Sequence, residues 1–408
     1  MTIDHFRRWG IAPPRPILSV LFMVCALWNE AAPLPAAESV APGDGATTVT
    51  VTPFGVTPEG EAVQAFEMRN AHGLTARVMT YGATLISLAA PDRYGHFDDI
   101  VLGFDTLEEY LNRNFGGTTG RFANRIGGAR FTLDGKEHTV TANAGRHHIH
   151  GGRRGFSAVV WQGAPLADHD DDGLGPAVRF TYVSPDGEEG YPGTLTCAVT
   201  YQLTHDNALL IQYEATTDRP TVINLTNHGY YNLGGAGAGN VHDHILWIDA
   251  DQYTPADADL IPTGEWAPTR GGPLDFTTPH HLGERIGDLT ATGGYDHNFV
   301  FNEWDGELAL RARVYEPRSG RAMELFTSEP GMQLYTANHL RELPGRDGKT
   351  YERHGGFCLE TQRPSDSPNQ PTFPSTTLRP GEVFRSRTVH RLLTRETPEA
   401  AFPAAHAD

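Results

Sequence analysis

Two stretches of the chain carry side chains suited to acid–base chemistry, one with a histidine and one with a glutamate. The first, residues 221–233, opens with three β-branched residues and therefore predicts a strand. Side chains alternate between the faces of a strand, so Asn224, Thr226 and His228 are expected to share one face. A histidine and an amide in an otherwise apolar run indicate a polar pocket lined by a sheet. The alternative is a core histidine with a structural role.

The second stretch, residues 356–362, places Glu360 at the end of an apolar run. In a strand Cys358 and Glu360 share one face, and Phe357 and Leu359 share the other. Loss of water raises the pKa of such a glutamate, whereas hydrogen bonds to its ionised form oppose the rise. A carboxylate that titrates near neutral pH is suited to general-base catalysis. The alternative is a glutamate that caps a strand at the rim of a sheet.

Two further stretches offer groups that bind polar ligands. In the glycine-rich run 116–128, Asn124 and Arg125 stand between apolar neighbours. An arginine in this position can direct its fork of donors to a polyhydroxylated or anionic ligand, unless it is a surface loop residue. Asp296 precedes an apolar strand; it either accepts hydrogen bonds from sugar hydroxyls or forms an Asx-turn into the strand.

A histidine cluster at 147–150 has the spacing of some metal sites, because His148 and His150 would share a face of a strand. No carboxylate follows, and Arg153 and Arg154 are unfavourable beside a cation. We therefore favour one imidazole of the cluster as a hydrogen-bond donor in a pocket, held where two glycines let the backbone turn sharply. A purely structural role is the alternative.

The acidic loop 168–173 resembles the start of a calcium-binding loop. However, Arg179 occupies the position where that loop needs a glutamate. We expect a solvated hairpin tip here, and no metal site in the chain.

The composition indicates a soluble globular protein: 39% of the 408 residues are hydrophobic, 20% are charged, and the net charge is −18. An acidic chain without a basic stripe is not expected to bind nucleic acid. Beyond the N-terminal segment only Cys197 and Cys358 remain, too few for a disulfide framework.

Residues 1–37 have the order of a secretory signal peptide. Arginines precede an apolar run at 17–28, which is too short to span a bilayer, and small residues follow, with cleavage expected near Ala32 or Ala37. Lipid modification of Cys25, a twin-arginine signal and a retained anchor are alternatives. We expect a periplasmic or secreted protein that has no membrane segment after cleavage.

The remaining chain predicts one large all-β domain at 46–395, between a flexible leader at 38–45 and a disordered tail at 396–408. Short β-type runs are broken by Gly, Pro, Asn and Asp, without repeats or βαβ alternation. Asp134-Gly135 predicts the tight turn of a hairpin. Helical turns are expected only at 107–112 and 280–287. Strands are expected at 48–52, 76–81, 85–89, 177–183, 194–203, 208–215 and 308–315, which favours an antiparallel β-sandwich.

Several blocks, in this order, give the chain a family resemblance. They are 80–83 (Thr-Tyr-Gly-Ala), 99–104 (Asp-Ile-Val-Leu-Gly-Phe), 120–126 (Gly-Arg-Phe-Ala-Asn-Arg-Ile), 150–152 (His-Gly-Gly), 224–228 (Asn-Leu-Thr-Asn-His), 294–298 (Gly-Tyr-Asp-His-Asn), 331–336 (Gly-Met-Gln-Leu-Tyr-Thr), 360–362 (Glu-Thr-Gln), 368–371 (Pro-Asn-Gln-Pro) and 373–375 (Phe-Pro-Ser). With them the chain resembles the aldose 1-epimerases, also called galactose mutarotases, from about 52 to 393.

The resemblance implies a large antiparallel β-sandwich of the galactose mutarotase type, a supersandwich, with the site on its open face. It implies interconversion of α and β anomers of free aldohexoses such as glucose and galactose, without metal or organic cofactor. Carried onto this chain, His228 is the acid toward the ring oxygen and Glu360 the base toward the anomeric hydroxyl. The partner would be a small-molecule aldose, and the protein a monomer or homodimer. The residues that would hold the sugar are Asn124, Arg125, His150, Asp296 and Gln333.

Two other functions stay open from the sequence. A hexose-phosphate 1-epimerase of the same fold would need cations aimed at a phosphate, for which Arg153 and Arg154 are candidates, although export would make sugar phosphates scarce. A non-catalytic sugar-binding module could keep Arg125 and Asp296 but would not need both Glu360 and His228.

Overall fold

The computed structural model describes residues 48–166 and 174–403. The expected signal peptide, the leader and the acidic loop at 168–173 lie outside these residues. Within them no helix is long and apolar enough to cross a membrane.

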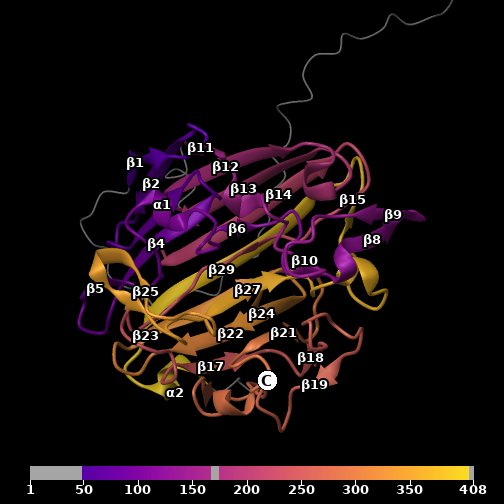
Figure 1. The fold of residues 1–408 in the computed structure, drawn as a ribbon. Coiled ribbons are helices and arrows are strands. Elements are labelled where there is room, and N and C mark those ends of the chain that lie inside the picture. Colours follow the sequence, from indigo (N-terminus) through magenta and orange to yellow (C-terminus); the bar gives the residue numbers. More distant parts are fainter. Residues whose placement is uncertain (1–47, 167–173, 404–408) are drawn as a thin grey trace, which may run out of the picture. The chain divides into compact units, whose positions relative to one another are not determined.

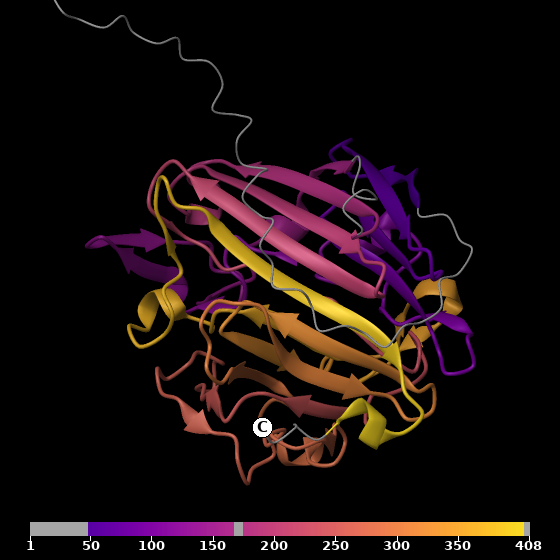
Figure 2. The same cartoon turned by 180° about the vertical axis from the view of Figure 1, so that it is seen from behind.

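The architecture consists of one nine-stranded and two five-stranded sheets, and their strand pairs are antiparallel. Both five-stranded sheets lie in front of the nine-stranded sheet in Figure 1, and Figure 2 shows the nine-stranded sheet from its other face. The order of the large sheet is β11 (Gln162–Pro165), β12 (Ala177–Ser184), β13 (Leu195–Leu203), β14 (Ala208–Thr217), β29 (Phe384–Thr394), β23 (Arg321–Thr327), β22 (Ala309–Tyr315), β17 (Ile245–Ile248) and β20 (His280–His281).

The first five-stranded sheet contains the N-terminal strands in sequence order: β1 (Thr48–Val56), β2 (Ala62–Arg69), β3 (Thr75–Met79), β4 (Thr84–Pro91) and β5 (Phe97–Asp99). The second, which we call the site sheet, has the order β19 (Ala267–Pro268), β18 (Gln252–Thr254), β21 (Asp296–Val300), β24 (Gly331–Tyr335) and β27 (Cys358–Gln362). The predicted all-β sandwich is confirmed, and so are the seven expected strands.

The core lies between the large sheet and the two smaller ones. Phe66 of β2 meets Phe180 of β12 edge-on, with ring centroids 5.6 Å apart. The site sheet contributes Leu334 and Leu359 to the core cluster that also holds Val199 of β13. Burial of this apolar surface, at about 25 cal/mol per Å², is the main force that holds the layers together.

Short elements complete the fold. Two-stranded pairs join β7 (Arg125–Ile126) to β10 (His148–Ile149), β6 (Thr118–Thr119) to β16 (Thr226–Asn227), β15 (Thr221–Val222) to β28 (Thr377–Leu378), β8 (Arg130–Leu133) to β9 (Lys136–Thr139), and β25 (Leu343–Pro344) to β26 (Thr350–Tyr351). Within 48–166 and 174–403 the helices are α1 (Leu107–Tyr110) and α2 (Pro398–Ala401), with 3₁₀ turns at Gly127–Ala129, Phe156–Ala158, Glu188–Gly190, Ile286–Asp288, Arg346–Gly348 and Ser367–Asn369.

Two local predictions are confirmed at this level. Asp134 and Gly135 both have positive φ, 51° and 77°, as the primed turn between β8 and β9 requires. The helical turn expected at 107–112 is α1. In the region 280–287, by contrast, His280 and His281 form strand β20, and helical structure begins only at Ile286.

Part of the predicted disordered tail, residues 396–403, is described and has structure, whereas 404–408 lie outside the described residues. Within 396–403 the chain forms α2, where the Thr397 side chain accepts a hydrogen bond from the Ala400 backbone at 3.4 Å. Ala401 is buried in a small apolar cluster with Ile245 and Tyr315. The N-cap and this packing order a segment whose Ala/Pro-rich composition suggested none.

The predicted single strand across 221–233 is wrong. Residues of this stretch pair in turn with β28, with β6 and, through Tyr231, with Val101 and Phe357. Between β15 and β16 the Asn224 side chain takes the place of backbone pairing: it donates to the Arg363 carbonyl and accepts from the Arg363 amide, both at 3.0 Å. Because the partners change, Thr226 does not share a face with His228: it lines a different small cavity, beside His390.

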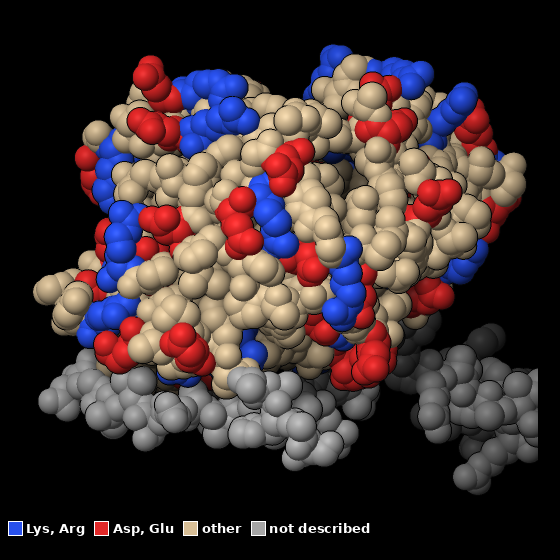
Figure 3. Space-filling view, turned by 90° about the horizontal axis from the view of Figure 1, so that it is seen from below, with Lys and Arg blue, Asp and Glu red and all other residues tan. Residues whose placement is uncertain are grey.

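Charges of both signs are present on the face of the molecule that is seen from below in Figure 3. On the face drawn in Figure 3, blue and red side chains are interspersed, and the coloured residues form no basic stripe. This distribution agrees with the acidic composition and shows no electrostatic footprint for a polyanion on that face.

Candidate active site

The site sheet provides the floor of the site. Glu360 of β27 lies opposite Gln333 of β24, and Gln333 lies opposite Asn298 of β21. Asp296, two residues before Asn298, projects from the same face, and Gln333 Nε2 donates to its Oδ1 at 2.6 Å. Alternation thus sends polar side chains to the site and apolar ones, such as Leu359, to the core.

Two loops place Asn124, Arg125 and His150 at the edge of this floor. β7 and β10 pair Arg125 with Ile149, the His150 amide donates to the Asn124 carbonyl at 3.0 Å, and the Asn124 amide donates to His150 Nδ1 at 3.2 Å. After His150 the chain turns at Gly151, with φ 86°. A Cβ on Gly151 would lie 1.6 Å from the Gly120 carbonyl oxygen, so this turn requires glycine, as the sequence predicted.

The His228 ring is fixed from several sides. Its backbone exchanges hydrogen bonds with Gly116 and Gly117, at 2.8 and 3.0 Å. The ring stacks on Tyr230, with centroids 5.0 Å apart and planes 20° apart, and Cys358 Sγ lies 3.6 Å from Nδ1. Nε2 then faces Glu360, 3.7 Å from Oε1.

One cavity of about 530 Å³ brings these groups together, and all seven predicted site residues line it. Four lining residues were not predicted from the sequence: Ile149, Tyr230, Tyr335 and His339. Ile149 and Tyr230 are neighbours of predicted residues, and Tyr335 follows Gln333 by the two positions that keep a side chain on one face of a strand. That spacing was a usable signal for Tyr335, whereas no sequence signal identified His339.

The electrostatics of the cavity favour an uncharged resting pair. Burial, together with the negative charge of Asp296, raises the pKa of Glu360 to about 8, while Arg125 opposes the rise. Burial lowers the pKa of His228 to about 4. Between these values the pair holds one proton, which rests on Glu360; its transfer to His228 leaves the total charge unchanged.

The donor set disfavours a bound cation. Ligand atoms of His150, His228 and Glu360 lie within 4.8 Å of one another, which is close enough for a metal site on distance alone. However, Nδ1 of His150 accepts the Asn124 amide, so a neutral ring carries its proton on Nε2 and has no free lone pair. Burial also lowers the pKa of His150 well below its usual value, so this ring is a neutral donor.

The rest of the histidine cluster is structural. His148 bridges the Tyr191 hydroxyl and the Thr141 carbonyl, at 2.6 and 2.7 Å. His147 accepts the Gly128 amide at 3.0 Å through Nδ1. Neither histidine lines the cavity.

Arg153 and Arg154, the candidates for a phosphate site, lie outside the cavity. Both side chains are exposed, and their backbone amides donate to Glu189. Arg154 also lies 3.9 Å from Glu61. The cation that lines the cavity, among the predicted residues, is Arg125.

Comparison with known proteins places the chain in a family. Residues 64–391 match the model of the aldose 1-epimerase family. Galactose mutarotase of Rattus norvegicus is 44% identical over 345 residues, which are 84% of this chain and 97% of the relative. Aldose 1-epimerase of Escherichia coli K12 is 33% identical, over 82% of this chain and 97% of the relative.

Solved structures agree with this assignment. An aldose epimerase homologue from C. elegans has a TM-score of 0.74 at 30% identity, covering 86% of this chain and 99% of its own. Galactose 1-epimerase from Lactobacillus acidophilus has the same TM-score, 0.74, at 25% identity, with 86% and 99% coverage. The chain therefore belongs to the aldose 1-epimerase family.

Proposed function

We propose that this protein interconverts the α and β anomers of free aldohexoses such as glucose and galactose, with His228 as the acid and Glu360 as the base. The observation that carries the proposal is the placement of two buried side chains in one cavity, with His228 Nε2 3.7 Å from Glu360 Oε1. Membership in the aldose 1-epimerase family supports the same reaction.

The reaction needs one proton removed and one proton delivered. Ionised Glu360 takes the proton of the anomeric hydroxyl, the C1–O5 bond breaks, and protonated His228 delivers its proton to O5. The products are the open-chain aldehyde, a protonated Glu360 and a neutral His228. Rotation about C1–C2 and the reverse transfers then close the ring to the other anomer.

The number of protons that His228 and Glu360 hold together suits a reversible reaction. The reactive form, ionised Glu360 with protonated His228, has the same number of protons as the resting form, in which Glu360 is protonated. Positive charge on Arg125 favours the ionised carboxylate in that cavity. General acid and base catalysis each supply typically about 10²–10⁴-fold.

The other predicted residues would hold the sugar ring. His150 offers a fixed Nε2–H donor, and Asp296 offers carboxylate acceptors whose orientation is set by Gln333. Asn124 Oδ1 accepts from Arg125 at 3.3 Å, which aims the guanidinium into the cavity. Such fixed groups reduce the entropy lost when a substrate is oriented.

A polarimetric assay tests the function. Fresh α-glucose or α-galactose should reach the equilibrium rotation faster with the protein than without it, whereas a hexose phosphate should gain little, because neither Arg153 nor Arg154 lines the cavity. No acceleration with any free aldose would refute the proposal and favour a non-catalytic sugar-binding module.

Where the protein acts is a separate proposal. The order of arginines, apolar run and small residues in 1–37 supports export to the periplasm or the medium. Cell fractionation followed by N-terminal sequencing tests it: a mature chain that starts near residue 33 or 38 is expected, and an intact cytoplasmic chain would refute it.

A further inference from the structure

Strand β1 is an open edge of the first five-stranded sheet. It pairs with β2 on one side, and within the described residues no backbone hydrogen bond joins it to another segment. Figure 1 shows β1 at the margin of the fold, beside β2. The strand has nine residues, whereas the other edge strands of the three large sheets, β5, β11, β19, β20 and β27, have two to five. An edge of this kind presents free N–H and C=O groups to which another strand can pair.

One half of this edge is closed by the chain itself. Pro53 has no N–H group, and the register with β2 shifts between Pro53 and Gly55. Helix α1 packs on this end of the strand, because a Cβ on Gly55 would lie 2.8 Å from Leu107 Cβ. The half that stays open for pairing is therefore 48–52.

The open half has none of the usual protection against another strand. Natural edge strands are blunted by charged side chains, prolines or bulges. Residues 48–52 are instead an uncharged run of β-branched residues, Thr-Val-Thr-Val-Thr, with a high strand propensity. Val51 lies opposite Phe66, which is 1% exposed in the core, yet Val51 itself is 41% exposed. Apolar surface at the rim of the core is therefore in contact with water at this edge, and an added strand would cover it.

The sequence of the open half is a palindrome centred on Thr50. Antiparallel pairing of two copies about a two-fold axis at Thr50 places Thr48 of one copy opposite Thr52 of the other. The same pairing places Val49 opposite Val51. Threonines then meet threonines on one face of the joined sheet, and valines meet valines on the other. The occupant that fits this edge by symmetry is therefore a second copy of the same chain.

We propose that two copies of this chain form a homodimer through residues 48–52, with their first five-stranded sheets joined into one continuous antiparallel sheet. Each copy uses the same patch, so the interface is isologous and closes after two subunits. A contact of this length belongs to the small, transient class, which buries less than about 1,200 Å², and the dimer therefore forms at high protein concentration.

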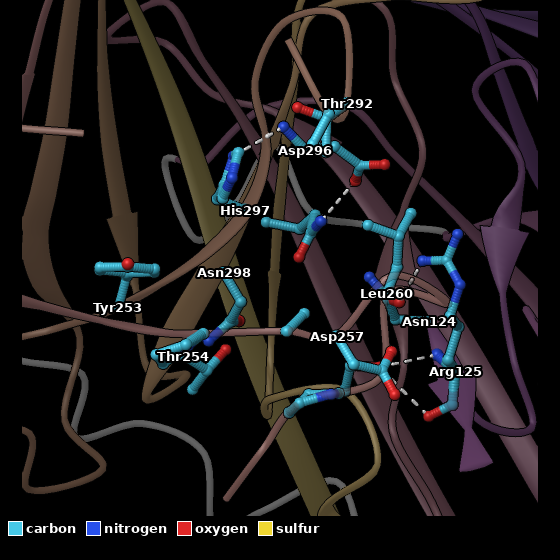
Figure 4. A pocket seen from close by; sticks show the side chains of 16 residues that line it. Asn124, Arg125, Tyr253, Thr254, Asp257, Leu260, Thr292, Asp296, His297 and Asn298 are labelled. Carbon is cyan, nitrogen blue, oxygen red and sulfur yellow. Dashed lines mark hydrogen bonds between the residues drawn. The ribbon is translucent and has the colours of Figure 1, made fainter. Parts of the chain in front are cut away.

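The interface is separate from the candidate active site. No residue of β1 lines the cavity that holds His228 and Glu360, and none is among the side chains drawn in Figure 4, which line the pocket adjoining that cavity. The inference is therefore independent of the proposed function. Substitutions in 48–52 should leave the rate of mutarotation unchanged.

Cysteine cross-linking tests the register of the two strands. Directly opposite residues of an antiparallel pair have Cα atoms about 4.5–5.5 Å apart, which is within the range of a disulfide. Thr50→Cys should therefore give a disulfide-linked dimer under mild oxidation. Thr52→Cys is the matched control, because two copies of residue 52 would be about 13 Å apart along the strands, and it should not cross-link. Cys197 and Cys358 are buried and are common to both variants.

A charge at the two-fold axis provides the second test. Thr50→Lys would place two lysines opposite each other and should keep the protein monomeric. Glu67 lies opposite Thr50 within the chain and offers the new cation a partner, so the fold should be kept. Thr50→Glu should also be monomeric, and an equimolar mixture of the two variants should restore the dimer. Thr196→Lys changes an exposed threonine of β13, a strand that is paired on both sides, and should dimerise like the wild type.

Sedimentation equilibrium between about 1 µM and about 1 mM protein measures the mass of each variant. The wild-type mass is expected to rise with concentration toward twice that of one chain, and thermal unfolding at the lowest concentration checks the fold. The inference is overturned if the wild type stays monomeric over this range, or if Thr50→Lys dimerises as well as Thr196→Lys. It is also overturned if Thr52→Cys cross-links as readily as Thr50→Cys.

Discussion

Nε2 of His228 lies 3.7 Å from Oε1 of Glu360, although one residue comes from an irregular segment and the other from strand β27. Both side chains are buried, at 6% and 2% exposure. The order of their pKa values is reversed relative to exposed groups, about 4 for the imidazole and about 8 for the carboxyl. Between about pH 4 and pH 8 the two side chains therefore hold one proton between them.

The first prediction concerns the base. Glu360→Gln keeps the shape of the side chain but removes the carboxylate, so kcat should fall by about 10²-fold or more. The fold should survive, because Glu360 is uncharged in the resting protein at neutral pH. Polarimetry with glucose measures kcat, and thermal unfolding checks the fold.

The matched control for this variant is a buried glutamate outside the cavity. Glu324 pairs with Arg313 at 3.0 Å on the large sheet. Glu324→Gln should lower the melting temperature while kcat stays within a few-fold of wild type. A full rate in Glu360→Gln would show that the base is another group.

The second prediction is the pH profile. Between about pH 4 and pH 8 the pair holds one proton and kcat/KM should be near its maximum. Below this window a second proton binds and no base is left; above it the pair loses its proton and no acid is left. Loss of the Asp296 charge favours ionised Glu360, so Asp296→Asn should move the alkaline limb to lower pH.

Arg125 affects the pKa of Glu360 in the opposite direction to Asp296, so its substitution is a further check of the pH profile. Its positive charge lowers the pKa of Glu360, and Arg125→Gln should therefore move the alkaline limb to higher pH. Asp257 does not line the cavity that holds His228 and Glu360, so Asp257→Asn should leave the limb in place. A limb that moves in the same direction in Asp296→Asn and Arg125→Gln would contradict this account.

The strands, Glu360 and the turn after His150 could be predicted from the sequence because each is a local pattern, whereas the sugar-holding role of a residue such as Gln333 was implied only by the family resemblance. Alternation placed Cys358 and Glu360 on one face, and glycines after His150 marked a turn that a Cβ would block. The segment 221–233 failed because its hydrogen-bond partners are distant in sequence, and Asn224 replaces ladder bonds that alternation assumes. His339 lines the cavity from the turn after β24, outside the regular strand, where alternation makes no prediction.

The third prediction concerns Cys358 as a positioning residue. Burial raises the pKa of its thiol, so the S–H group stays protonated beside His228 Nδ1, 3.6 Å away. Cys358→Ala removes this partner and should lower kcat about five- to tenfold, as expected for one weak hydrogen bond, with little change in KM. Cys358→Ser should restore most of the rate.

A second buried cysteine provides the control. Cys197 lies in β13 of the large sheet and does not line the cavity. Cys197→Ala should change stability but neither kcat nor its pH profile. Equal rates in Cys358→Ala and wild type would remove Cys358 from the positioning of His228.

The last prediction tests the turn that holds His150. Gly151 has φ 86°, and a Cβ there would meet the Gly120 carbonyl oxygen at 1.6 Å, so Gly151→Ala must shift the backbone. We expect a loss of about 3 kcal/mol or more in the free energy of unfolding, together with a raised KM, because His150 and Asn124 are joined through this turn.

Gly145 is the control that distinguishes backbone strain from a steric clash of the Cβ atom. It also has a positive φ, 60°, but no atom lies within 4 Å of its Cβ position. Gly145→Ala should cost only about 1–2 kcal/mol and leave KM unchanged. Urea unfolding and polarimetry on the two variants measure both quantities, and equal losses would mean that backbone strain alone, not the contact with Gly120, requires glycine at position 151.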